Sequence, residues 1–292
     1  MWLDQSIESL QSFQRASCGL LGAVAACVML LFSPTAAAQT ARVKNIMLCN
    51  GSDRTSPDPQ IDGCGALIAS GQEAPQTVAV AYNNRANAYV MKGEYDLAIK
   101  DYNEAIKLVP NSASYLNNRG VAYKKKAEYD LALEDFDQSI RLNPAYAGAF
   151  ANRAGAYVYK AAYERAAHDY DEAIRLGETV PEVWNGRCWS YAMLGKLQEA
   201  LADCNEALRL KPNEPIALDS RGLTYLKMGR WDAAIADYDL ALQLDPQLAT
   251  ARYGRGLARL RKGDHAGSDA DLAAAQAIKA KIAEEFARYG VH

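Results

Sequence analysis

The sequence has few of the residues from which catalytic and metal sites are usually built. Its 292 residues include only three histidines, His168, His265 and His292, and none has cysteine or carboxylate neighbours at metal-ligand spacing. Phosphate-binding glycine loops, a Gly-x-Ser-x-Gly turn and a His-Glu-x-x-His motif are absent. The sequence therefore predicts a chain that is not an enzyme and that uses no cofactor and no metal.

An excess of positive charge is also lacking. The chain has 32 lysines and arginines against 35 aspartates and glutamates, which gives a net charge of −3. Binding to a phosphate backbone needs a surplus of basic side chains, and this composition does not supply one. Nucleic acid is therefore not an expected partner.

Long apolar runs are equally scarce. One run, residues 18–32, follows Arg15 and precedes the small residues Ala36–Ala38. It is short for a membrane span of about 20 residues, and the alanines form a suitable cleavage site. We expect residues 1–38 to be a signal peptide, the mature chain to be periplasmic or secreted, and no membrane span to remain after cleavage. An uncleaved N-terminal membrane anchor is the alternative.

Residues 39–78 show no long-range regularity. The stretch from 49 to 59 is rich in Gly, Ser, Asp and Pro, which predicts a loop. Residues 60–70 carry Ile61, Cys64, Leu67 and Ile68 at helical spacing, and Gly71 then ends the pattern. We expect a loop followed by one capping helix that covers the apolar edge of the next segment.

From residue 79 the sequence repeats every 34 residues, without insertion or deletion. The alanine at position 20 of the first unit, Ala98, recurs in this register up to Ser268 in the sixth. Each unit has two apolar stripes at helical spacing, one with a large, a small and an aromatic residue and one with a small, a large and a small residue. Such stripes predict two closely packed antiparallel helices per unit. The six units are 79–112, 113–146, 147–180, 181–214, 215–248 and 249–282.

Turn residues punctuate these units at fixed places. Position 15 is glycine in four units and position 32 is proline in four, which predicts a tight turn inside each unit and a helix end after it. The residues concerned are Gly93, Gly195, Gly229 and Gly263, and Pro110, Pro144, Pro212 and Pro246.

The length and the order of large, small, aromatic and proline positions resemble the tetratricopeptide repeat, in the Asn-Arg-Gly form of bacterial exported proteins. This resemblance implies an all-α, right-handed α-solenoid of six helix-turn-helix repeats with N- and C-terminal capping helices. The sixth unit departs from the pattern, with Arg252, Arg259, Ser268 and Leu272 at core positions. We expect it to be a terminal cap, followed by a last capping helix in residues 283–292.

Two charged positions recur in all six units. Position 7 is always arginine and position 23 is always aspartate. A turn near position 15 places these two positions at one level of the hairpin, so we predict a structural ladder of ion pairs, within each repeat or across each junction. Its members are Arg85, Arg119, Arg153, Arg187, Arg221 and Arg255 with Asp101, Asp135, Asp169, Asp203, Asp237 and Asp271.

Four cysteines remain after the expected signal peptide, and they form two local pairs. Cys188 and Cys204, at positions 8 and 24 of the fourth unit, face the same helix interface. Cys49 and Cys64 flank the N-terminal loop and its helix. We expect disulfides Cys49–Cys64 and Cys188–Cys204, as an oxidising compartment permits, with buried free thiols as the alternative.

The resemblance also implies a peptide-binding groove on the inner face of the first helix of each repeat. It predicts an exported, non-catalytic scaffold that binds a peptide or a partner protein there. A self-associating assembly element or an accessory subunit of a cell-envelope complex is the main alternative, and an enzyme is a minor one. The groove residues are Asn83, Asn84, Asn87, Asn117, Asn118, Lys124, Lys125, Asn152, Tyr159, Asn185, Trp189, Met193, Lys227 and Arg261.

Overall fold

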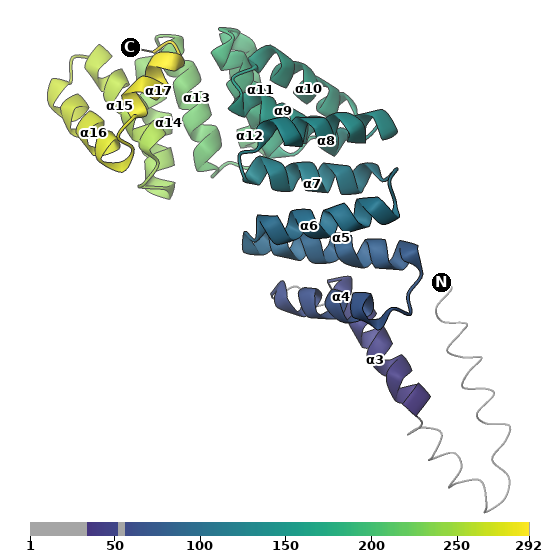
Figure 1. Ribbon diagram of the computed structural model, residues 1–292. Helices are drawn as coiled ribbons and strands as arrows, with labels where there is room; N and C mark the ends of the chain where they lie inside the picture. The colour runs from purple at the N-terminus through teal and green to yellow at the C-terminus, as the bar shows by residue number, and fades with distance from the viewer. Residues whose placement is uncertain (1–33, 52–55, 292) are drawn as a thin grey trace, which may run out of the picture. The chain divides into compact units, whose positions relative to one another are not determined.

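The computed structural model describes residues 34–51 and 56–291 (Figure 1). These residues form fifteen helices and no strand, which confirms the all-α prediction. Among the described helices, none combines the length and apolar character needed to cross a bilayer. The chain divides into two compact units, Met1–Val109 and Pro110–His292. Most of the expected signal peptide, residues 1–33, lies outside the described residues.

The first unit is built from two helical pairs. Its helices are α3 (Pro34–Cys49), α4 (Asp58–Ser70), α5 (Pro75–Lys92) and α6 (Tyr95–Leu108). α3 packs on α4, and α4 packs on α5. Cys49, Cys64 and Leu67 form a small buried cluster with Ala81 of α5. The predicted capping helix therefore covers the first repeat as α4.

Helix α3 corrects the expectation of one loop and one capping helix in residues 39–78. Its axis approaches α4 closely at Gly63, where an added Cβ atom would lie 2.6 Å from Cβ of Leu48 and 2.9 Å from the backbone nitrogen of Cys49. Val43 and Met47 on the same helix are half exposed. Because apolar side chains face both solvent and α4, the sequence lacks the one-sided pattern that predicts a helix.

The second unit contains five further hairpins and a terminal helix, and neighbouring hairpins pack on one another. Its helices are α7 (Ala113–Lys125), α8 (Tyr129–Leu142), α9 (Ala147–Tyr159), α10 (Tyr163–Arg175), α11 (Pro181–Met193), α12 (Leu197–Leu210), α13 (Pro215–Lys227), α14 (Trp231–Leu244), α15 (Ala249–Arg261), α16 (His265–Ile278) and α17 (Ile282–Arg288). Together with α5 and α6, these hairpins follow the predicted 34-residue spacing.

The turn inside each hairpin needs a left-handed residue at position 15. Gly93, Gly195, Gly229 and Gly263 adopt φ values between 72° and 85° there. The second and third repeats have alanine instead, and Ala127 and Ala161 still adopt φ values of 61° and 56°. Since this conformation costs an alanine about 1 kcal/mol, helix packing on both sides of the turn determines its shape.

Small residues let the helices approach wherever an aromatic ring fills the interface. Tyr238 of α14 is fully buried between Gly222 of α13 and Gly254 of α15. A Cβ atom added to Gly222 would lie 2.7 Å from the Tyr238 ring, and one added to Gly254 would lie 2.4 Å from it. The ring therefore joins its own hairpin to the next, so glycine is required on both sides.

The sixth unit forms a complete hairpin despite its unusual residues. Leu272 replaces the aromatic residue at position 24 and packs against Gly256. Arg259 donates a hydrogen bond to Asp271 at 2.9 Å and so stays hydrogen-bonded at a core position. Helix α17 begins at Ile282 and buries Ile282 and Phe286 against the last hairpins, which closes the apolar end of the array.

Candidate functional site

The recurring arginines and aspartates are occupied with each other. In all six repeats the Nε and Nη2 atoms of the arginine donate to the two carboxylate oxygens of the aspartate sixteen residues later, at 2.6–2.8 Å. All six aspartates are buried. These paired groups form the scaffold and are not free to bind a ligand.

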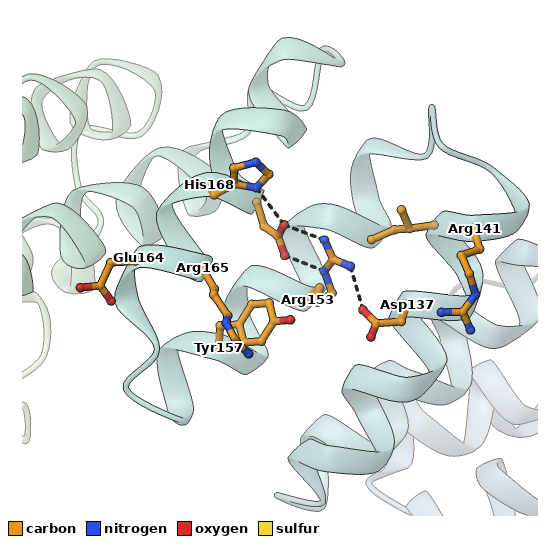
Figure 2. Close-up of a pocket in the computed structure, with 9 residues that line it drawn as sticks. Asp137, Arg141, Arg153, Tyr157, Glu164, Arg165 and His168 are labelled. Atoms are coloured by element: carbon orange, nitrogen blue, oxygen red, sulfur yellow. Dashed lines mark hydrogen bonds and ion pairs between the residues drawn. The ribbon is translucent and has the colours of Figure 1, made fainter.

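The ladder also crosses junctions in the second unit. Nη1 of Arg153 donates to Asp137 of the preceding hairpin at 2.7 Å, and Arg187 and Arg255 make the same contact. In Figure 2 the Arg153 rung lies at the centre of a cleft of about 560 Å³ between α8, α9 and α10. Both arrangements left open by the sequence therefore occur together, within repeats and across junctions.

The cleft in Figure 2 has balanced charges. The side chains of Arg141, Arg153 and Arg165 line it together with three carboxylates, those of Asp137, Glu164 and Asp169. This cleft offers neither a surplus of positive charge for an anion nor, within the described residues, a cluster that could hold a metal. We therefore assign it to the scaffold.

Both expected cysteine pairs are joined. Cys49 and Cys64 connect the end of α3 to α4, with Cα atoms 4.6 Å apart. Cys188 and Cys204 connect α11 to α12 across the interface of the fourth hairpin, with Cα atoms 5.3 Å apart. Each bond links two helices that already pack together, so its role is structural.

A larger cleft, of about 780 Å³, opens on the first helices of the third, fourth and fifth repeats. Its wall comes from α9, α11 and α13, and α17 contributes one edge. The lining side chains that carry the argument below are Tyr159, Tyr163, Glu182, Asn185, Trp189, Glu214, Ile216, Asp219, Glu285, Arg288 and Tyr289. We call this site the inner cleft.

Apolar side chains are exposed on the wall of the inner cleft. Tyr159 is 68% exposed and its ring stacks on that of Tyr129, with centroids 5.0 Å apart. Ile216 is 50% exposed. Oδ1 of Asn185 is buried, yet no described residue donates a hydrogen bond to it. A rigid aromatic ring beside an unused acceptor is suited to contact with a polypeptide segment.

A buried carboxyl lies on the same wall. Asp219 of α13 is only 7% exposed, and Thr250 donates a hydrogen bond to its Oδ2 atom at 2.6 Å. Burial raises the pKa of Asp219 from 3.8 to about 7, and the nearby charge of Glu285 adds to this effect. No described lysine or arginine pairs with it. Asp219 is thus a carboxyl without a counter-ion.

Polar groove residues of the second and third repeats form a network beside the inner cleft. Lys124 donates to Asn152 at 3.3 Å, and Asn152 donates to Asn117 at 3.1 Å. Asn117 in turn donates to Tyr146 and to Asn118. Burial lowers the pKa of Lys124 to about 8. These side chains brace α7 against α9 in addition to facing the inner side.

The C-terminal segment covers part of the predicted groove. Trp189 packs edge-on against Tyr289, with ring centroids 5.0 Å apart, and Lys227 donates to the backbone oxygen of Tyr289 at 2.9 Å. Met193 packs into the core. The structure thus places these predicted groove residues beneath or beside the chain's own end, while Lys125 and Arg261 are exposed elsewhere.

The three groove asparagines of the first unit have structural partners. Asn84 donates to the backbone oxygen of Cys49 and so holds α3 near α5. Asn87 accepts a hydrogen bond from Tyr102 at 2.5 Å, and Asn83 donates to Asn84. Bracing of neighbouring helices accounts for these contacts without a ligand.

Family models match the chain at four of its repeats or pairs of repeats. A model described as "TPR repeat" matches residues 86–127 and 222–263, and one described as "Tetratricopeptide repeat" matches residues 113–146 and 181–214. The last two ranges are the second and fourth units in the register found from the sequence. The chain is a tetratricopeptide repeat protein. A comparison with curated proteins gives no match.

Solved structures of other tetratricopeptide repeat proteins share this fold. One from Parabacteroides merdae is 20% identical, with a TM-score of 0.65 over 86% of this chain and 99% of the other. Pseudomonas aeruginosa pilF is 19% identical, with a TM-score of 0.61 over 74% and 99%. YrrB, described as having an unusual peptide-binding site, is 22% identical, with a TM-score of 0.50 over 64% and 97%. At these identities the likeness shows the fold alone.

The inner cleft of this tetratricopeptide repeat protein contains some of the predicted residues and several others. Tyr159, Asn185 and Trp189 line it together. Glu182 and Ile216 were not among the groove residues, although both occupy position 2 of their repeats, which the family uses in its groove. The contributions of α17 have no signal in the 34-residue period, because this helix follows the last repeat.

Proposed function

We propose that this chain is an exported, non-catalytic scaffold that binds an extended segment of a partner protein in the inner cleft. Tetratricopeptide repeat proteins generally act as scaffolds for protein interactions, and YrrB is described as binding peptide. The observation that carries the proposal is the wall itself, where exposed Tyr159 and Ile216 flank the unused acceptor of Asn185. A peptide backbone N–H supplies the missing donor, and apolar side chains cover the two exposed ones.

Removal of the two exposed apolar side chains is the test of this proposal. We expect a Tyr159→Ala, Ile216→Ala variant to lose partner binding by at least about tenfold, since aromatic anchors typically contribute more than 1 kcal/mol. The measurement is the dissociation constant of a partner captured from the cell envelope and then purified. Leu240→Ala is the matched control, because Leu240 is 48% exposed on α14 and does not line the inner cleft. Equal affinity of all three proteins would contradict the proposal.

We propose export on separate grounds. The apolar run at residues 18–32 and the two disulfides support an oxidising destination. We expect the chain isolated from the cell envelope to begin at Gln39 and to have no reactive thiol, as measured by intact mass before and after alkylation. A mass that includes residues 1–38 would favour the membrane-anchor alternative. Four alkylated cysteines in the mature chain would contradict export into an oxidising compartment.

A further inference from the structure

The inner cleft carries more negative than positive charge. Four carboxyl side chains line it, those of Glu182, Glu214, Asp219 and Glu285, against the single guanidinium of Arg288. Glu214 pairs with Lys211 and Glu285 with Lys279, both at the rim. Glu182 is exposed and has no ion pair among the described residues. The lining therefore favours a ligand with positive charge.

The buried polar atoms of the inner cleft need donors. The carboxyl of Asp219 receives one hydrogen bond, from Thr250, and has no cationic partner among the described residues. Oδ1 of Asn185 receives none within the same described part. Both are acceptors, and a buried acceptor left without a donor costs about 1–3 kcal/mol. The ligand that completes the site must therefore bring N–H groups as well as charge.

The remaining wall is aromatic. The rings of Tyr159, Tyr163, Trp189 and Tyr289 line the inner cleft around these acceptors. Aromatic faces attract cations and also cover the methylene stem that carries a cationic group. A lysine or arginine side chain combines all three properties, since it has an apolar stem, a positive charge and several N–H donors.

We propose that the inner cleft takes a lysine or arginine side chain from the partner's segment, with its charged group donating to Asp219 and Asn185 and its stem against the aromatic wall. This inference rests on the proposed peptide-binding function and specifies the chemistry of the partner. The raised pKa of Asp219 supports it, because burial without a counter-ion produces that shift and an incoming cation reverses it.

Selection from a phage-displayed library of random twelve-residue peptides tests the inference on the whole chain with both disulfides formed. We expect lysine and arginine to be enriched at least threefold among peptides whose binding is lost with Tyr159→Ala. Replacement of the basic residue by glutamine in a selected synthetic peptide should weaken its binding about tenfold to the wild type, and less than twofold to Asp219→Asn. Glu199→Gln is the matched control, because Glu199 is exposed on α12 and outside the inner cleft.

The outcomes separate the two proposals. Tyr159-dependent peptides that are neutral or acidic would overturn the basic-ligand inference and leave peptide binding intact. Basic peptides that bind Asp219→Asn as they bind the wild type would overturn the role of Asp219 and with it the inference. Selection of no peptide that depends on Tyr159 would overturn the proposed function and the inference together.

Discussion

Replacement of Gly254 by alanine should destabilise the second unit by about 3 kcal/mol, because the new methyl group has no space. It would lie 2.4 Å from Cζ and Oη of Tyr238, and that side chain is fully buried and cannot move aside without disturbing two hairpins. The measurement is urea unfolding followed by circular dichroism. Tyr238→Phe removes one of the two closest atoms, so the cost of the alanine should be smaller but still present in that background.

Gly65→Ala is the control for this prediction. Gly65 also lies inside a helix, α4, but the nearest atom to its added Cβ is Nη1 of Arg85 at 3.6 Å. Alanine is favoured over glycine in helices by about 1 kcal/mol, so this change should be neutral or stabilising. Equal losses from the two substitutions would show that close contact with Tyr238 is not the cause.

Asp219→Asn should stabilise the chain at pH 8 by about 3 kcal/mol and have little effect at pH 4. The pKa of Asp219 is raised from 3.8 to about 7 in the folded chain, so the folded state retains a proton that the unfolded state loses. The stability associated with this proton is fully present below about pH 4 and is lost as the pH rises to about 7. Asparagine does not titrate, so its unfolding free energy should lack this decline.

Urea unfolding of both proteins between pH 4 and pH 8 measures this difference. The groups that face Asp219 are Glu285 of α17, Tyr289 and the buried Tyr238, and the nearby charge of Glu285 further raises the pKa of Asp219. Glu285→Gln should therefore reduce the dependence on pH without abolishing it. Stability curves that stay parallel for wild type and Asp219→Asn would contradict the prediction.

The repeated part of the fold could be predicted from the sequence because each repeat depends on local spacing. The same large, small and aromatic positions recur six times, so an error in one unit is corrected by the others. Helix α3 could not be predicted in this way, since it occurs once and its contact with α4 depends on Gly63. The turns at Ala127 and Ala161 likewise follow from packing and not from residue type.

The inner cleft could be predicted only in part. Family positions identify Tyr159, Asn185 and Trp189, because a groove formed by equivalent helices has equivalent residues on its wall. The charge and the missing donors of the site depend on which side chains are buried, and the sequence does not contain that information. Glu285 and Tyr289 enter the site because α17 folds back, and that contact joins segments far apart in the chain.

The fold-back of α17 has a practical consequence for work on this protein. Tyr289 lies three residues before the last residue of the chain and forms one edge of the inner cleft, with Lys227 bound to its backbone. Any sequence fused after His292 would thus be tethered at the mouth of the cleft, at a high local concentration. A polyhistidine or lysine-rich tag in that place would compete for an acidic site of this kind. Capture handles and fluorescent labels therefore belong on the outer helices, for example at Glu199 of α12.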